Sequence, residues 1–348
     1  MAQIDAFFKM MHDLGASDLH LSSGSQPVIR LHGDMQRVKY KSLASDDLKK
    51  MLFEITPAMK AKEFEESGDV DFSYEVPSLA RYRVNFFQQR LGVGAVFREI
   101  PQKILTIDDL GLPSILKNMA TLPKGLVLVT GPTGSGKSTT LAAMIDFANK
   151  NRKDHILTIE DPIEFVHEPS SCLINQREVG RDTRSFKAAL RGALREDPDI
   201  ILVGEMRDLE TIELALEAAE TGHLVLGTLH TISASKTIDR IIEVFPGQLQ
   251  GQIRSGLADS LRGVVAQNLF KRVDKKGRVA ALEILIATPA VRNLIRENKV
   301  FQINSVIETG RKYGMQSVDD AIMKLLTADI IDSEEAYNKA VNKSKFRD

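Results

Sequence analysis

The sequence predicts an α/β protein in which helices cover a largely parallel sheet, preceded by a smaller α+β domain. Two observations predict it. From about residue 120, strand-length apolar runs alternate with helix-like segments, a pattern typical of parallel sheets. The first 100 residues instead mix amphipathic helix signals with short alternating strands. The length of 348 residues suits two domains.

The N-terminal region, residues 1–100, contains signals for both helices and strands. The start, MAQIDAFFKMMHDLG, has the spacing of an amphipathic helix. Residues 26–38 predict two strands with a turn at Gly33-Asp34, and residues 42–55 predict a helix. Further strands are expected in VDFSYEV, RYRVNFFQQR and GVGAVFREI. Residues 101–114, with a proline near each end, are expected to be a linker.

The core region, residues 115–285, contains four strand-length apolar runs, at 125–130, 155–160, 200–205 and 223–230. After it, residues 286–348 are expected to be mostly helical. The expected helices are 289–297, 299–309, 315–327 and 333–343. Ser333 is the expected N-cap of the last one.

Composition excludes several classes of protein. The net charge is −1, so no bulk electrostatic attraction favours nucleic acid or acidic membranes. The single cysteine, Cys172, excludes an intrachain disulfide and suits a reducing compartment. The start lacks a signal peptide pattern, and no apolar run reaches the length of a membrane-spanning helix. We therefore expect a cytoplasmic protein that contacts a membrane through a partner.

A glycine-rich motif follows the first apolar run of the core. It has the form Gly-x-x-x-x-Gly-Lys-Ser, between a strand and a helix, which is the phosphate-binding P-loop pattern. Backbone N–H groups and the helix N-terminus would surround the phosphates, and the serine hydroxyl would bind Mg²⁺. The sequence thus predicts an ATP site formed by Gly131, Pro132, Thr133, Gly134, Ser135, Gly136, Lys137, Ser138 and Thr139.

Two other apolar runs end in carboxylates. The run at 155–160 leads into Glu160, Asp161 and Glu164, and the run at 200–205 ends in Glu205. The carboxyl ends of parallel strands share one edge of a sheet, so these groups can face the nucleotide. A P-loop enzyme needs such groups to hold Mg²⁺ and to orient the attacking water. The alternative reading of Glu205 is a solvated strand end.

His223 and His230 bracket the run HLVLGTLH. Residues seven apart on a regular strand lie on opposite faces, so both cannot point at one phosphate. We favour His230, at the C-terminal end, as the residue nearer the γ-phosphate, while the alternative is a structural core histidine. Zinc is not expected, because no partner has suitable spacing.

Four segments, taken in order, resemble one known family. GPTGSGKSTT, IEDPIEF, DPDIILVGEMRD and TGHLVLGTLHT are similar to the Walker A, Asp, Walker B and His boxes of the secretion-superfamily ATPases. In these motors of type II secretion and type IV pili, the resemblance makes Glu164 the general base. It makes Glu205 a Mg²⁺ ligand through water, although the two roles could be exchanged.

The resemblance also implies a ring. Arginines of the N-terminal domain would complete a neighbour's site, and Arg83 and Arg98 are favoured over Arg81 and Arg90. Arginines on strands are also commonly solvated surface groups, which is the alternative reading. An arginine finger accelerates phosphoryl transfer by about 10³ to 10⁵.

Two further motifs indicate one group within this superfamily. GASDLHL (15–21) and AVRNLIRENK (290–299) resemble those of the twitching-motility retraction ATPases, the PilT family. The second usually begins Ala-Ile-Arg, and Val291 keeps the β-branching. By composition alone, the same stretch would be an amphipathic surface helix.

The resemblance to that family covers nearly the whole chain. It implies a PAS-like domain followed by a RecA-like P-loop ATPase domain, assembled as a homohexamer that uses ATP and Mg²⁺. The motor would act on an inner-membrane platform protein of the pilus machinery and drive pilus retraction. It would lie at the inner-membrane face, and an accessory retraction ATPase is a further partner that the resemblance allows.

Three alternatives stay open at this point. The first is the accessory retraction ATPase itself, a close paralogue. The second is a RecA-like nucleic-acid motor, disfavoured because the chain has no Trp, 6% aromatic residues and no long basic run. We accordingly expect no nucleic-acid partner. The third is a regulatory module that binds ATP without turnover, disfavoured because the expected catalytic residues are all present.

Overall fold

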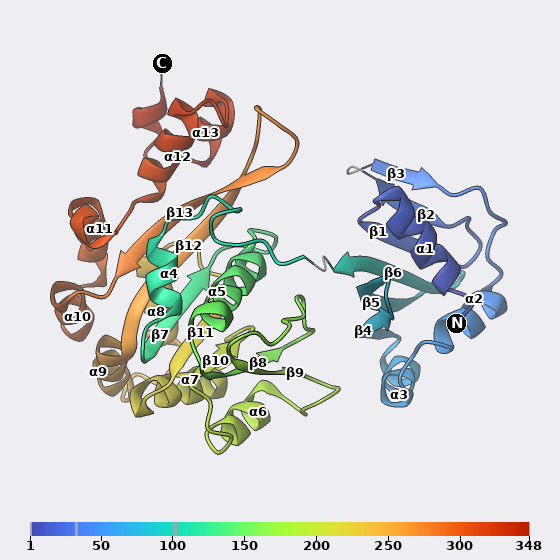
Figure 1. The fold of residues 1–348 in the computed structure, drawn as a ribbon, viewed down its shortest axis with the longest axis horizontal. Helices are drawn as coiled ribbons and strands as arrows, with labels where there is room; N and C mark the ends of the chain where they lie inside the picture. The colour runs from blue at the N-terminus through green and yellow to red at the C-terminus, as the bar shows by residue number, and fades with distance from the viewer. Residues whose placement is uncertain (1, 32–33, 101–102, 348) are drawn as a thin grey trace. The chain divides into compact units, whose positions relative to one another are not determined.

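The chain folds into two compact units, Met1–Lys103 and Ile104–Asp348 (Figure 1). A computed structural model describes residues 2–31, 34–100 and 103–347. The predicted α/β class is confirmed, with an α+β unit followed by a unit built on a mainly parallel sheet.

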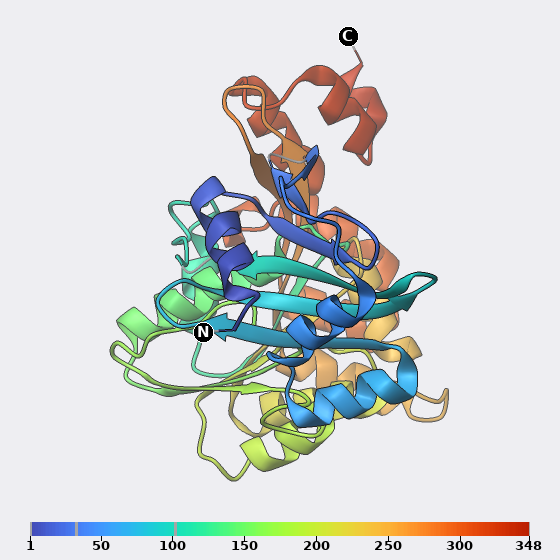
Figure 2. The same cartoon turned by 90° about the vertical axis from the view of Figure 1, so that its right-hand side faces the viewer.

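The first unit is a six-stranded antiparallel sheet with strand order β3-β2-β1-β6-β5-β4 (Figure 2). The strands are β1 Asp18–Ser22, β2 Val28–Leu31, β3 Asp34–Arg37, β4 Asp69–Val76, β5 Ala80–Gln89 and β6 Gly92–Ile100. The helices are α1 Asp5–Leu14, α2 Ser45–Phe53 and α3 Ala58–Ser67.

One face of this sheet carries the core of the first unit. Phe8 of α1 stacks on Tyr82 of β5 with ring centroids 4.2 Å apart, and both side chains are fully buried. Alternation along β5 and β6 turns the intervening residues, Arg83 and Arg98 among them, to the other face. The predicted helices and strands of this region are confirmed. Asp34 is already the first residue of β3, and Gly33 lies outside the described residues.

The second unit has a seven-stranded sheet in the order β13-β12-β7-β11-β10-β8-β9. All neighbours from β12 to β9 are parallel, and β13 is antiparallel at one edge. The four predicted runs form β7 Gly125–Thr130, β8 His155–Glu160, β10 Ile200–Val203 and β11 Leu224–Leu229. The sequence analysis did not identify β9 Leu173–Glu178, β12 Leu261–Lys271 or β13 Arg278–Ile286.

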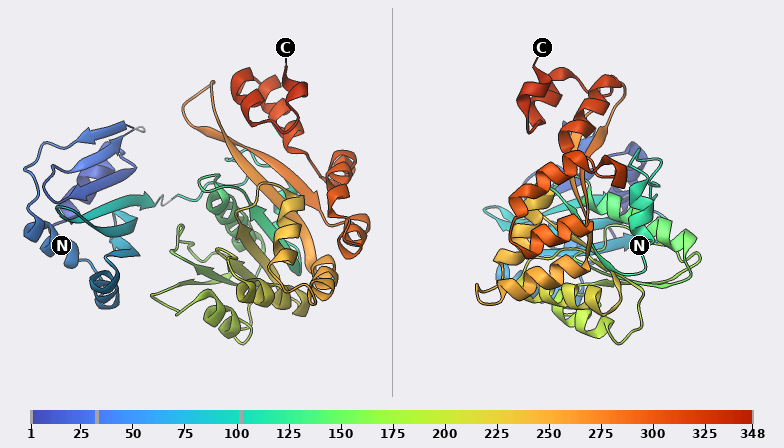
Figure 3. Two further views of the ribbon diagram at one scale, coloured as in Figure 1. Left: turned by 180° about the vertical axis from the view of Figure 1, so that it is seen from behind. Right: turned by 90° about the vertical axis from the view of Figure 1, so that its left-hand side faces the viewer.

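Helices cover both faces of this sheet. One face packs on α4 Ile115–Ala120 and α5 Lys137–Asn151. The other packs on α6 Phe186–Ala193, α7 Leu209–Thr221, α8 Ala234–Glu243, α9 Gln250–Ser260, α10 Pro289–Arg296 and α11 Ile303–Thr309. From behind, the golden helix α8 is seen lying across this second face (Figure 3).

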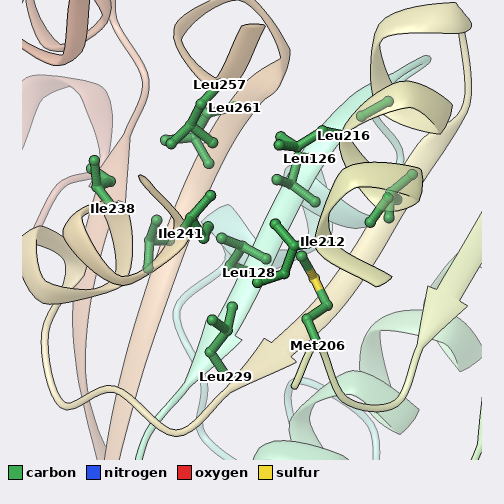
Figure 4. Packing of buried hydrophobic residues seen from close by; sticks show 14 of the residues in the cluster. Leu126, Leu128, Met206, Ile212, Leu216, Leu229, Ile238, Ile241, Leu257 and Leu261 are labelled. Atoms are coloured by element: carbon green, nitrogen blue, oxygen red, sulfur yellow. The ribbon is translucent and has the colours of Figure 1, made fainter. Parts of the chain in front are cut away.

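Strand β7 lies at the centre of this packing. Its alternate residues Leu126 and Leu128 face Ile212 and Leu216 of α7, and neither leucine is exposed (Figure 4). The intervening residues Val127 and Val129 pack on the opposite side. Because both faces of β7 are buried, its sequence is a continuous apolar run rather than an alternation of apolar and polar residues.

The C-terminal helices are shorter than predicted. The segment predicted as 299–309 begins with the 3-10 turn η1 Val300–Gln302, and within the segment 315–327 the helix α12 Val318–Thr327 starts three residues later than predicted. The 3-10 turn η2 Arg311–Tyr313 lies between the two segments. The last segment divides into α13 Ser333–Lys339 and η3 Lys343–Phe346. Because α10 and α11 share the core of α7 to α9, they belong to the same compact unit. The finer division into 1–100, 101–114, 115–285 and 286–348 stays a prediction.

The prediction that Ser333 caps the last helix is wrong. Asp332 is the N-cap, because its Oδ1 accepts the backbone N–H of Glu335 at 2.7 Å. Ser333 is the first helical residue. Aspartate also suits the positive end of the helix dipole, which favours it over the neighbouring serine.

In the described residues, no helix has both the length and the apolar character needed to span a bilayer.

We expect Asp332→Ala to weaken α13 by about 1 kcal/mol, because it removes the capping acceptor. Amide hydrogen exchange in residues 333–339 should then accelerate about fivefold. Ser333→Ala is the matched control and should leave exchange unchanged. Faster exchange in the control than in Asp332→Ala would restore Ser333 as the cap.

Candidate active site

The predicted P-loop joins β7 to α5 and requires glycine at its turns. Gly131 has φ 140° and Gly136 has φ 86°, in the region that favours glycine. A Cβ on Gly131 would also lie 2.3 Å from the backbone oxygen of Gln267. Helix α5 begins at Lys137, directly after the loop, so its N-terminal N–H groups point into the loop.

Lys137 is folded back on the loop. Its Nζ donates to the backbone oxygens of Gly131 at 2.9 Å and Pro132 at 3.1 Å, and the residue is 9% exposed. Burial lowers the pKa of the lysine, and the charges of Glu205 and Glu164 oppose that shift. Both carboxylates therefore lie within electrostatic range of the P-loop lysine.

Gln267 of β12 supports the loop from the side, a role that sequence reasoning missed. Its Nε2 donates to the backbone oxygen of Ser135 at 2.6 Å, and its Oε1 accepts the hydroxyl of Thr140 at 2.7 Å. Gln267 is buried, so these bonds satisfy a polar group that would otherwise be costly. The contact spans 132 residues of sequence, and no local pattern marks it.

Glu205 lies in the turn that follows β10, two residues after the strand ends. Its Oε1 accepts from Nε2 of His230 at 3.0 Å and from Nε of Arg207 at 2.7 Å. Burial by itself raises the pKa of Glu205. The hydrogen bonds and charges of Arg207 and His230 lower this pKa by more, so that it lies below its usual value. Glu205 is therefore an ionised carboxylate at neutral pH.

Strand order explains why Glu205 and His230 meet. β11 lies between β7 and β10, and its end, Leu229, pairs in register with Thr130 of β7. His230 follows at once, next to the P-loop strand and the Glu205 turn. The backbone N–H of Met206 donates to the backbone oxygen of Thr228 at 3.0 Å, and this hydrogen bond holds the Glu205 turn against β11.

His223 lies at the opposite end of β11. Its Nδ1 is 2.9 Å from the backbone oxygen of Ala218, at the end of α7. Of the two histidines, His230 lies at the sheet edge that bears the P-loop, and its place beside the γ-phosphate stays a prediction.

Glu164 is half-buried in the segment that leaves β8. The other acidic residue, Glu160, ends β8 and accepts the hydroxyl of Thr158 at 2.6 Å. Burial raises the pKa of Glu160 to about 6, against hydrogen bonds from Thr158, Gln176 and the backbone N–H of Glu164. Of the three acids predicted after this strand, Asp161 is exposed.

Ser138 and Thr139 are half-buried in the first turn of α5, directly after Lys137. Pro132, Thr133 and Gly134 form the exposed tip of the loop. Among the described residues, no group of three or more His, Cys, Asp or Glu side chains is arranged to hold a metal ion.

Arg83 and Arg98 lie in the first unit, on adjacent strands and directly opposite one another in register. Both residues are exposed. Nε of Arg98 donates to Oδ1 of the buried Asp18 at 2.8 Å, which fixes that guanidinium on the sheet surface. Arg81 is instead buried beside Ser73.

Comparisons with known proteins show the family to which the chain belongs. The model of the family described as type II/IV secretion system protein matches residues 2–338. The chain belongs to this family, among its PilT ATPases. It is 58% identical to the "Type IV pilus retractation ATPase PilT" of Pseudomonas aeruginosa, covering 94% of each protein. The identity falls to 38% for the "Type IV pilus ATPase PilU" of that organism, with 99% of this chain and 90% of PilU covered.

A solved structure of the same group has a very similar fold. The pilus retraction motor PilT with bound ADP superposes with a TM-score of 0.91 at 44% identity, covering 99% of this chain and 98% of that one. The bound ADP belongs to that protein, and it supports a nucleotide site in a fold shared along the whole chain.

Gly131→Ala should weaken nucleotide binding, because a Cβ there meets the backbone of Gln267 and the φ is strained. Strain of about 1–3 kcal/mol corresponds to roughly tenfold to hundredfold weaker binding. Titration with fluorescent ADP measures it. Gly247→Ala is the control, because its Cβ meets nothing within 4 Å, and it should bind like the parent. Unchanged affinity in Gly131→Ala would contradict this view of the loop.

Acid should destabilise the protein through His167. This residue is 6% exposed, and its Nδ1 has no hydrogen-bond partner among the described residues. Burial lowers its pKa to about 4. The unfolded chain binds a proton near pH 6.5 and the folded chain does not, so stability is highest above pH 6.5 and declines toward pH 4. The loss at pH 4 is on the order of 3 kcal/mol.

Urea unfolding of the parent and of His167→Gln at pH 7 and pH 5 tests this link. The variant should be less stable at pH 7 but should lose less stability than the parent between the two values. Equal losses in the two proteins would exclude His167 as the source.

Proposed function

We propose that this chain is a Mg²⁺-dependent ATPase motor that drives the retraction of type IV pili, and with it twitching motility. The observation that carries the proposal is the contact of Glu205 with His230, at the sheet edge that also bears the P-loop. An isolated phosphate-binding loop needs neither residue, whereas hydrolysis of a γ-phosphate needs both a metal-side carboxylate and nearby polar groups.

Each site residue has a proposed role. Glu164 accepts a proton from the attacking water, and Glu205 holds a metal-bound water in place. Ser138 offers its hydroxyl as a ligand, and His230 orients Glu205 and faces the γ-phosphate. Exchange of the roles of Glu164 and Glu205 is the alternative, because both act electrostatically on Lys137.

Mg²⁺ suits this donor set. An ionised carboxylate and a serine hydroxyl are oxygen ligands of the kind it prefers, and it commonly keeps several waters beside phosphate oxygens. When bound with the nucleotide, it would offset the negative charge that develops during transfer.

The active form is proposed to be a homohexamer. Arg83 and Arg98 would act on the nucleotide of a neighbouring protomer, where an arginine contributes about 10³ to 10⁵ in rate. This proposal rests on the family resemblance and on the exposure of both side chains. Isolated protomers should accordingly be nearly inactive.

The motor is proposed to work in the cytoplasm, at the inner-membrane face, on a membrane platform protein of the pilus machinery. Identity of 58% to PilT against 38% to PilU supports the main retraction motor over the accessory paralogue. An accessory retraction ATPase would then be a partner.

Glu164→Gln should lower the hydrolysis rate at least 100-fold while ATP still binds, because glutamine cannot accept the proton of water at this pH. Phosphate release and ATP titration by the purified protein measure the two quantities. Glu168→Gln is the control, since this exposed glutamate lies four residues away in the same segment. Turnover at the parental rate would remove Glu164 as the base.

The same variant tests the biological role. A strain whose only copy carries Glu164→Gln should show abundant surface pili and no twitching, because fibres extend and do not retract. The Glu168→Gln strain should twitch like its parent. Cells without pili would instead indicate an extension motor, and normal twitching would exclude a main retraction role.

A further inference from the structure

The segment between β8 and β9 carries Glu164, and its backbone is held by side chains. Strand β9 lies at one edge of the sheet, parallel to β8. Register pairs Thr158 with Gln176 and Glu160 with Glu178. Four polar side chains therefore stand on one face, where the two strands end and the Glu164 segment crosses above them.

Gln176 makes the central contacts. Its Nε2 donates to the backbone oxygen of Phe165 at 2.8 Å, and its Oε1 accepts the backbone N–H of His167 at 2.8 Å. The same Nε2 is 3.2 Å from Oε1 of Glu160. One amide thus binds the chain on the C-terminal side of Glu164.

A carboxylate binds the other side. Oε2 of the buried Glu178 accepts the backbone N–H of Ile163 at 3.1 Å. Glu160 contributes through Gln176, whose Nε2 donates to its Oε1. Backbone groups of residues 163, 165 and 167 are therefore held by the side chains of Gln176 and Glu178.

We infer that Gln176, together with Glu160 and Glu178, is a positioning residue that sets the orientation of the Glu164 carboxylate toward the attacking water. The inference rests on the proposed role of Glu164 as the base. Gln176 and Glu178 hold the backbone on both sides of residue 164, Glu160 holds the amide of Gln176, and this backbone directs the side chain of Glu164. A displacement of about 1 Å at such a group costs up to roughly 100-fold in rate.

Side chains on the opposite face of β9 make different contacts. Asn175 points away, and its Nδ2 lies 3.0 Å from Nε2 of His155. Asn175 and Gln176 are neighbours on one edge strand with similar chemistry, but of these two residues Gln176 alone has a hydrogen bond to the described part of the Glu164 segment. Asn175→Leu is therefore a matched control for Gln176→Leu.

The test compares kcat and nucleotide affinity. Gln176→Leu should lower kcat about 10-fold to 100-fold and leave the affinity for ATP within twofold, because the P-loop is untouched. Asn175→Leu should leave both unchanged. Amide exchange in residues 161–167 should accelerate in Gln176→Leu and not in the control. Parental kcat in Gln176→Leu, or an equal loss in both variants, would overturn the inference.

A double variant separates positioning from general destabilisation. If Gln176 acts through Glu164, adding Gln176→Leu to Glu164→Gln should cause no further loss of kcat. A further loss of tenfold would overturn the inference. If Gln176→Leu does not fold, Gln176→Asn keeps the amide but falls short of Phe165, and the same expectations apply. Parental activity of Glu164→Gln alone would instead refute the proposed base, while the exchange measurement still tests the contacts.

Discussion

The parallel pairing of β7, β11, β10 and β8 is the constraint on which the candidate site depends. Because these strands run in one direction and in level register, the P-loop, His230, the Glu205 turn and the Glu164 segment all emerge at one edge. No single segment forms the site. A shift of one residue between β10 and β11 would exchange the two faces of a strand and separate His230 from Glu205.

Much of this arrangement could be predicted from the sequence, because its signals are local. The P-loop pattern, the four apolar runs and the odd spacing of His223 and His230 each lie within a short window. The Ser333 error was also local, since two neighbouring residues both suit a helix N-terminus. The C-terminal helices are shorter because they begin later, after a 3-10 turn at residues 300–302 and after the N-cap Ser317, and the apolar spacing alone did not reveal these starts.

The supporting residues could not be predicted, because their contacts join distant segments. Gln267 reaches the P-loop across 132 positions, from a strand that the apolar pattern did not reveal. Gln176 belongs to the edge strand β9, whose mixed polarity resembles a loop. Strand order decides which polar side chain meets which backbone group, and a single sequence does not encode that order in any short pattern. These residues matter because each satisfies buried backbone groups of a segment that carries chemistry.

The neighbourhood of Lys137 has a consequence for charge balance. Within the second unit, the positive charges of Lys137 and Arg207 are matched by the carboxylates of Glu205 and Glu164. These four charges sum to zero, and a nucleoside triphosphate adds several negative charges beside them. Those charges are to be matched by cations that come from outside the fold of this unit. Nucleotide binding is thus coupled to the supply of such cations, and the local ionic surroundings become part of the conditions for turnover.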